Sequence, residues 1–201
     1  MSTVSRSTER LVGTALLAAL VLLLQFFVSI PLGAFTVTLT LVPIMLGAIL
    51  YGPTAGALLG GVFGVAVSIQ VITGAAGVTS TQMLQMAPVV TIAVCILKGV
   101  LAGLGAGAVH KLLRRKNNTV AVLLSAISCP LINTGLFTAA LFLFYYDLLV
   151  SYAAANALAN AFAFVFVGVL GLNFVVEFLV NVLLVPVVLR VMAIVTRGKH
   201  R

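Results

Sequence analysis

The stretch LNFVVEFLVNVLL, residues 172–184, decides the class of this protein. Apolar residues continue to Val195, which gives the length that a helix needs to cross a bilayer. Asn173, Glu177 and Asn181 interrupt this stretch at every fourth position, a spacing that places them on one face of a helix. An ionisable side chain at membrane depth costs about 2.5–3.5 kcal/mol or more, so it normally faces a protein interior or a cavity. The stretch therefore predicts a membrane-spanning helix with one face turned toward something polar.

The composition of the whole chain is that of a membrane protein. Of its 201 residues, 63% are hydrophobic and 7% are charged, too few charges to cover a soluble domain. Six apolar stretches can be read, at Leu11–Ile30, Val37–Tyr51, Thr54–Ile72, Met86–Leu113, Thr119–Tyr146 and Leu172–Val195. Stretches of this length favour helices, because a helix satisfies its own backbone hydrogen bonds in lipid. We predict a single all-α, polytopic membrane domain over residues 1–201, with six transmembrane helices of which the second is short.

The basic residues predict the orientation of the chain in the membrane. The net charge is +8, and the basic residues other than Lys98 form three groups, which precede the first stretch, follow the fourth, or close the chain. With six spans, all three groups fall on one side, which the positive-inside rule identifies as cytoplasmic. Both termini are therefore predicted to be cytoplasmic. The same placement argues against nucleic acid as a partner.

Glycine ladders predict close packing between the third and fourth spans. Glycine recurs at every fourth position, at Gly56, Gly60 and Gly64, and at Gly99, Gly103 and Gly107. Small residues let helix backbones approach one another, which is how helices associate in lipid. Two outer linkers are also predicted to be structured: Thr73–Gln85, and Asp147–Gly171, which is too apolar for open solvent and is interpreted as a lid or a short broken helix.

The chain lacks the residues that an enzyme would need. Its acids are Glu9, Asp147 and Glu177, and its histidines are His110 and His200. They form no H-E-x-x-H motif and no pair of aspartates, and the sequence has no phosphate-binding G-x-x-x-x-G-K-[ST] loop. We therefore predict a protein that is not an enzyme and that has no metal ion and no cofactor.

Polar residues inside the spans predict a binding pocket instead. Lys98 lies deep in the fourth span, and Asn133 follows Pro130 in the fifth. An amide can donate to and accept from a ligand at once, and a proline in a span frees a carbonyl and favours a kink. Lys98 and Glu177 either pair in the empty state or separately bind a polar ligand. The alternatives are that Lys98 extends toward the inner headgroups and that Asn133 bonds to another helix.

Three further glutamines belong to this hypothesis. Gln82 and Gln85 lie in an outer linker and are predicted to close the pocket from outside, while Gln25 in the first span is a weaker candidate. The complete predicted substrate-binding set is Lys98, Asn133, Asn173, Glu177, Asn181, Gln82 and Gln85.

Several motifs are similar to those of a known family, the substrate-binding S components of energy-coupling-factor (ECF) vitamin transporters. Ala15-Leu16-Leu17-Ala18-Ala19 is similar to the A-x-x-x-A motif of the family's first helix. Leu46-Gly47-Ala48 and Tyr51-Gly52-Pro53, continued by Thr54-Ala55-Gly56, resemble its LGA…GP.AG segment. The six spans and the chain length also fit.

The resemblance implies a high-affinity vitamin binder in a prokaryotic plasma membrane. In the family, the first helix docks a transmembrane T component that carries two cytoplasmic ATPases, so Ala15 and Ala19 are predicted to couple the chain to these partners. The family binds its vitamin in the outer half, between the last three helices and the outer loops.

The vitamin itself is predicted from chemistry and resemblance together. Riboflavin and thiamine sites are expected to stack a flat ring on aromatic side chains, yet the chain has no Trp and four Tyr. An aliphatic ligand with a carboxylate, an amide and hydroxyls suits Lys98 and the amides, and the polar segments of the last two spans look similar to pantothenate-type S components. Pantothenate is the prediction, with riboflavin, thiamine and pyridoxine as alternatives. A self-sufficient carrier or channel and a purely structural membrane protein are the competing classes.

Overall fold

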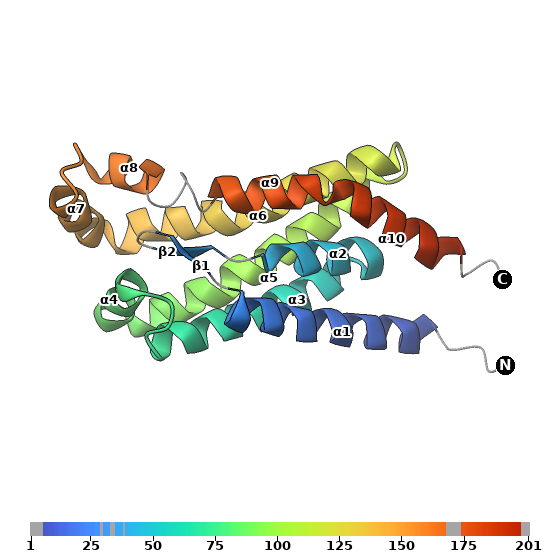
Figure 1. Cartoon of the computed structure of the whole chain (residues 1–201), viewed down its shortest axis with the longest axis horizontal. Helices are drawn as coiled ribbons and strands as arrows, with labels where there is room; N and C mark the ends of the chain where they lie inside the picture. The colour runs from blue at the N-terminus through green and yellow to red at the C-terminus, as the bar shows by residue number, and fades with distance from the viewer. Residues whose placement is uncertain (1–5, 29, 33–34, 38, 168–173, 198–201) are drawn as a thin grey trace.

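The computed structural model describes residues 6–28, 30–32, 35–37, 39–167 and 174–197. Its longer helices lie roughly along one long axis, with two short strands between them (Figure 1). The helices are α1 (Arg6–Phe27), α2 (Leu41–Tyr51), α3 (Pro53–Ile72), α4 (Val78–Met86), α5 (Pro88–Leu113), α6 (Asn118–Phe144), α7 (Tyr146–Ala155), α8 (Ala161–Phe164), α9 (Val175–Leu183) and α10 (Val185–Arg197). The strands are β1 (Ile30–Leu32) and β2 (Phe35–Val37).

The predicted all-α membrane architecture is confirmed. Five helical segments among the described residues are long and apolar enough to cross a membrane: α1, α3, α5, α6, and α9 and α10 taken together. The remaining stretch forms α2, which has 11 residues and is the short second helix that the sequence predicts. Leucine, valine and phenylalanine side chains on these helices are widely exposed, as expected of surfaces that face lipid.

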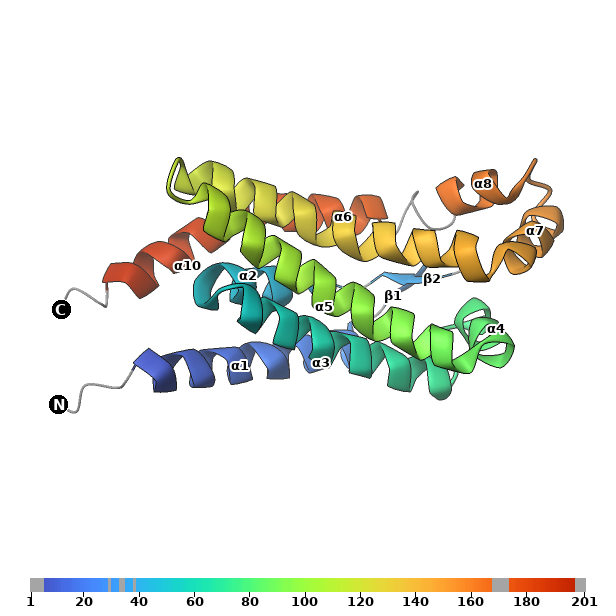
Figure 2. The ribbon, with the colours of Figure 1, turned by 180° about the vertical axis from the view of Figure 1, so that it is seen from behind.

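Both ends of the chain lie at the same end of the molecule, which we call the terminal end (Figure 1). The turn between α5 and α6, with its basic residues Arg114, Arg115 and Lys116, lies there too (Figure 2). Helices α4, α7 and α8 form the opposite end, which we call the outer end. The position of both ends at one end of the molecule and the grouping of basic residues there agree with a cytoplasmic terminal end.

The segment between the first two helices differs from the prediction. Ile30 and Val37 were expected at the ends of helical spans, but they pair with each other in an antiparallel ladder between β1 and β2. The helix α1 ends at Phe27 and α2 begins at Leu41. Pro31 explains part of the difference, because its ring disfavours helix for the residue before it and cannot continue one.

The last span is also divided. The helix α9 ends at Leu183 and α10 begins at Val185. Pro186, at the second position of α10, has no N–H to donate to the preceding turn, and proline is tolerated at the start of a helix. Figure 1 shows the change of direction between the two helices.

Glycines bring α3 and α5 into backbone contact, as the ladders predict. A Cβ atom on Gly56 would collide with the carbonyl group of Gly103, and one on Gly60 would collide with that of Gly99. A Cβ on Gly64 would stand 2.5 Å from the Cα of Ile96. The two ladders thus face each other and set the spacing of the helices at the centre of the bundle.

A buried polar network joins α1 to α3. The Nε2 of Gln25 donates to Oε1 of Gln70 at 2.6 Å, and Nε2 of Gln70 donates to the carbonyl of Gln25 at 2.9 Å. The hydroxyl of Thr40 donates to Oε1 of Gln25 at 3.0 Å. Gln25, the weaker ligand candidate, therefore has a structural role.

Candidate functional site

One face of α6 organises the candidate site. Cys129, Asn133 and Phe137 follow each other at every fourth position, so they share this face. Cys129 and Asn133 are buried, and α6 continues through Pro130 without interruption. We call the residues Cys129, Asn133 and Phe137 the α6 face.

Lys98 meets the outer part of this face. Its ammonium lies over the ring of Phe137 at 4.5 Å from the centroid and over that of Phe63 on α3 at 5.8 Å. A cation over an aromatic face is attracted by the ring quadrupole. The side chain is thus held between helices, and it does not extend to the inner headgroups, the alternative raised from the sequence.

Glu177 and Asn181 come to the same face from α9. Both are buried, with exposed fractions of 9% and 1%, and α9 packs on α6. The Nδ2 of Asn181 donates to the backbone carbonyl of Glu177 at 2.8 Å. Asn173, the third member of the predicted stripe, lies outside the described residues.

The structure places the two charged residues of the candidate site in different ways. Lys98 contacts the α6 face through the ring of Phe137. Glu177 is buried on α9, the helix that packs on α6. Direct pairing of Lys98 and Glu177 stays a prediction.

Three buried polar atoms on α6 and α9 have no hydrogen-bond partner among the described residues. They are Oδ1 of Asn133, Oγ1 of Thr138 and Oδ1 of Asn181. A buried polar group without a partner costs about 1–3 kcal/mol, so native proteins rarely keep one without a reason. The amide oxygens of Asn133 and Asn181 could accept hydrogen bonds from a ligand that enters between α6 and α9. Sequence reasoning did not single out Thr138, which lies five residues from Asn133 and therefore off the α6 face.

The glutamines of α4 are at the outer end. Gln82 accepts a hydrogen bond of 2.7 Å at Oε1 from the hydroxyl of Tyr152 on α7, whereas Gln85 is exposed. The hydroxyl of Tyr145, the residue between α6 and α7, lies 2.7 Å from the hydroxyl of Thr91 on α5. One tyrosine therefore joins α4 to α7, and the other joins the junction of α6 and α7 to α5. Closure of the site by Gln82 and Gln85 stays a prediction.

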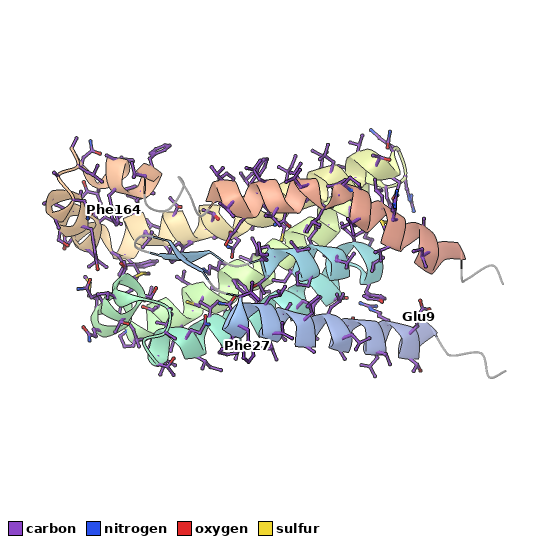
Figure 3. All side chains as sticks on the ribbon, in the orientation of Figure 1. Glu9, Phe27 and Phe164 are labelled. Atoms are coloured by element: carbon purple, nitrogen blue, oxygen red, sulfur yellow. The ribbon has the colours of Figure 1, made fainter. Side chains whose placement is uncertain are left out.

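The predicted coupling residues lie on an open helix surface. Ala15 and Ala19 are exposed on α1, as are Leu16 at 67% and Leu23 at 52%. Figure 3 shows α1 running along the edge of the bundle from Glu9, near the terminal end, to Phe27. This surface is accessible to lipid or to another membrane protein.

The comparisons with known proteins agree with this architecture. Residues 9–189 match the family described as "ECF transporter, substrate-specific component". A solved structure of ThiT from Listeria monocytogenes is similar in fold, with a TM-score of 0.61 at 21% identity, over 91% of this chain and 96% of that one. No curated protein sequence matches the chain. The chain therefore belongs to the family of substrate-specific components of ECF transporters, membrane subunits that bind a substrate for transport and are not enzymes.

Proposed function

We propose that the protein binds pantothenate from outside the cell and delivers it through an ATP-driven partner module. The site would comprise the α6 face together with Lys98, Glu177 and Asn181. The partners would be a T component and two cytoplasmic ATPases, in the plasma membrane of a prokaryote. The observation that carries the proposal is the set of buried oxygen atoms without partners on α6 and α9.

The chemistry of pantothenate suits these groups. Its carboxylate would pair with the ammonium of Lys98, which two aromatic rings keep inside the bundle. Its hydroxyls and amide N–H would donate to Oδ1 of Asn133 and Asn181, which need donors. A ligand that satisfies several buried polar groups gains affinity and selectivity, because an analogue without those donors would leave the groups unpaired.

The charge of Glu177 suggests a second candidate ligand. A buried carboxylate on α9, beside α6, would suit a cationic vitamin, and thiamine is the cationic member of the alternatives. The two candidates make opposite demands on the charged residues. An anionic vitamin depends on Lys98, and a cationic vitamin depends on Glu177.

Calorimetric titration of the purified subunit with pantothenate, thiamine, riboflavin and pyridoxine tests the proposal. We expect nanomolar binding of pantothenate without partner proteins. Lys98→Gln should weaken it at least tenfold, about 1.4 kcal/mol, while the exposed Lys111→Gln should not change it. Binding of thiamine that is lost in Glu177→Gln and kept in Lys98→Gln would refute pantothenate and establish the cationic ligand. If none of the four vitamins binds, vitamin binding at this site is refuted.

A further inference from the structure

A groove opens between α1 and α3 close to the terminal end of the molecule. Its volume is about 310 Å³. Ser7, Arg10 and Thr14 line it from α1, and Thr54 lines it from the first turn of α3. This groove is at the opposite end of the bundle from the capping helices α4, α7 and α8 (Figure 1), and no role in substrate binding accounts for it.

The polar wall of the groove carries an oriented cation. The guanidinium of Arg10 donates to the hydroxyl of Thr54 across the groove. A guanidinium has five N–H donors in a planar fork, so one bond to Thr54 fixes its direction and leaves donors for a second acceptor. Phosphate is the group that this fork matches best, because two parallel N–H bonds reach two of its oxygens.

The groove also has apolar lining residues with exposed side chains. Leu11 and Leu58 line it and are 72% and 57% exposed. Both lie within segments that are apolar enough to span the membrane. A free phosphate would gain nothing from these leucines, whereas the acyl chains of a phospholipid would cover them.

We propose that this groove binds the headgroup of an anionic phospholipid of the inner leaflet. The phosphate would accept hydrogen bonds from Arg10, and the first segment of the acyl chains would pack on Leu11 and Leu58. The position fits, because the terminal end is the end that the basic residues assign to the cytoplasm, where anionic headgroups attract juxtamembrane cations. A lipid bound here would bridge α1 and α3 at the base of the helix that carries Ala15 and Ala19.

Native mass spectrometry of the full chain tests the proposal. The protein would be released from mixed micelles that contain equal amounts of phosphatidylglycerol and phosphatidylcholine, and the retained lipids would be counted. We expect one phosphatidylglycerol to be retained preferentially. Arg10→Gln should lower this preference about tenfold, the loss of a charge-assisted hydrogen-bonded contact. Thr14→Leu, which fills the groove and leaves the net charge unchanged, should also lower it.

Arg114→Gln is the matched control, because Arg114 is exposed at the same end, outside the groove, and the substitution changes the net charge by the same amount. This variant should keep most of the preference. Equal losses in Arg10→Gln and Arg114→Gln would show attraction by net charge alone and would overturn the proposal. Displacement of the lipid by millimolar inorganic phosphate would assign the groove to a free anion. An unchanged lipid count in Arg10→Gln and Thr14→Leu, together with lost transport, would assign it to a partner protein.

Discussion

Adding one methyl group at Gly60 should loosen the bundle, while the same change at the neighbouring Gly61 should not. A Cβ on Gly60 would collide with the carbonyl group of Gly99 and would stand 3.0 Å from the backbone nitrogen of Val100. These are backbone atoms of a neighbouring helix, so they cannot rotate away. A Cβ on Gly61 would meet only a side-chain methyl of Val100, at 3.6 Å, which is ordinary contact.

The expected magnitudes follow from this difference. Gly60→Ala forces α3 and α5 apart and should cost about 1–3 kcal/mol, as overpacking usually does. Gly61→Ala removes a flexible residue from a helix and should gain about 0.5–1 kcal/mol. In a chain of this size 1 kcal/mol shifts the melting temperature by about 2–4 °C. Gly60→Ala should therefore melt at least about 3 °C below Gly61→Ala.

Thermal unfolding followed with a thiol-reactive dye measures this difference. Cys95 and Cys129 are free and buried, so the dye should label them only as the bundle opens. Both variants carry the same composition change and the same thiols, which makes each the control of the other. Equal melting temperatures for the two variants would refute the conclusion that the glycine ladders set the distance between α3 and α5.

Three other predictions concern separate parts of the molecule. Gln70→Leu removes both side-chain hydrogen bonds between Gln70 and Gln25 from a buried network, which should cost about 1–3 kcal/mol in thermal unfolding; an unchanged melting temperature would show that these bonds do not stabilise the fold. Tyr152→Phe removes the bond to Gln82 and should increase hydrogen exchange in α4 while exchange in α3 and α5 stays the same. If exchange in α4 is the same in the variant and in the parent, this bond does not hold the outer helices together. Ala19→Phe should leave vitamin binding intact and abolish uptake by the complete transporter, and normal uptake would exclude α1 as the coupling surface.

Much of the fold can be predicted from the sequence, because membrane spans depend on local composition. The boundaries of α3 and α5 lie within two residues of the stretches read from hydropathy. The recurrence of glycine at every fourth position identified the face on which these helices pack. The pairing of β1 with β2 was not predicted, because an apolar segment of a few residues gives little signal to separate strand from helix. Pro31 was the available clue.

The candidate site could be predicted only in part, because its contacts join distant segments. The polar residues Lys98, Asn133 and Glu177 were identifiable since each is costly in lipid. The ring of Phe137 under the ammonium of Lys98 was not, because aromatic residues are common throughout such spans. The bond between Gln25 and Gln70 joins residues 45 positions apart, so no spacing rule could distinguish a structural glutamine from a ligand-binding one.

The most direct test of the site compares pantothenate with its primary alcohol analogue, which has no carboxylate, by calorimetry on the parent protein and on Lys98→Gln. If Lys98 binds the carboxylate, the parent should prefer pantothenate by about tenfold or more, about 1.4 kcal/mol, and Lys98→Gln should bind both compounds with similar affinity. A preference of the same size in both proteins would contradict the account, because the carboxylate would then be recognised somewhere other than at Lys98.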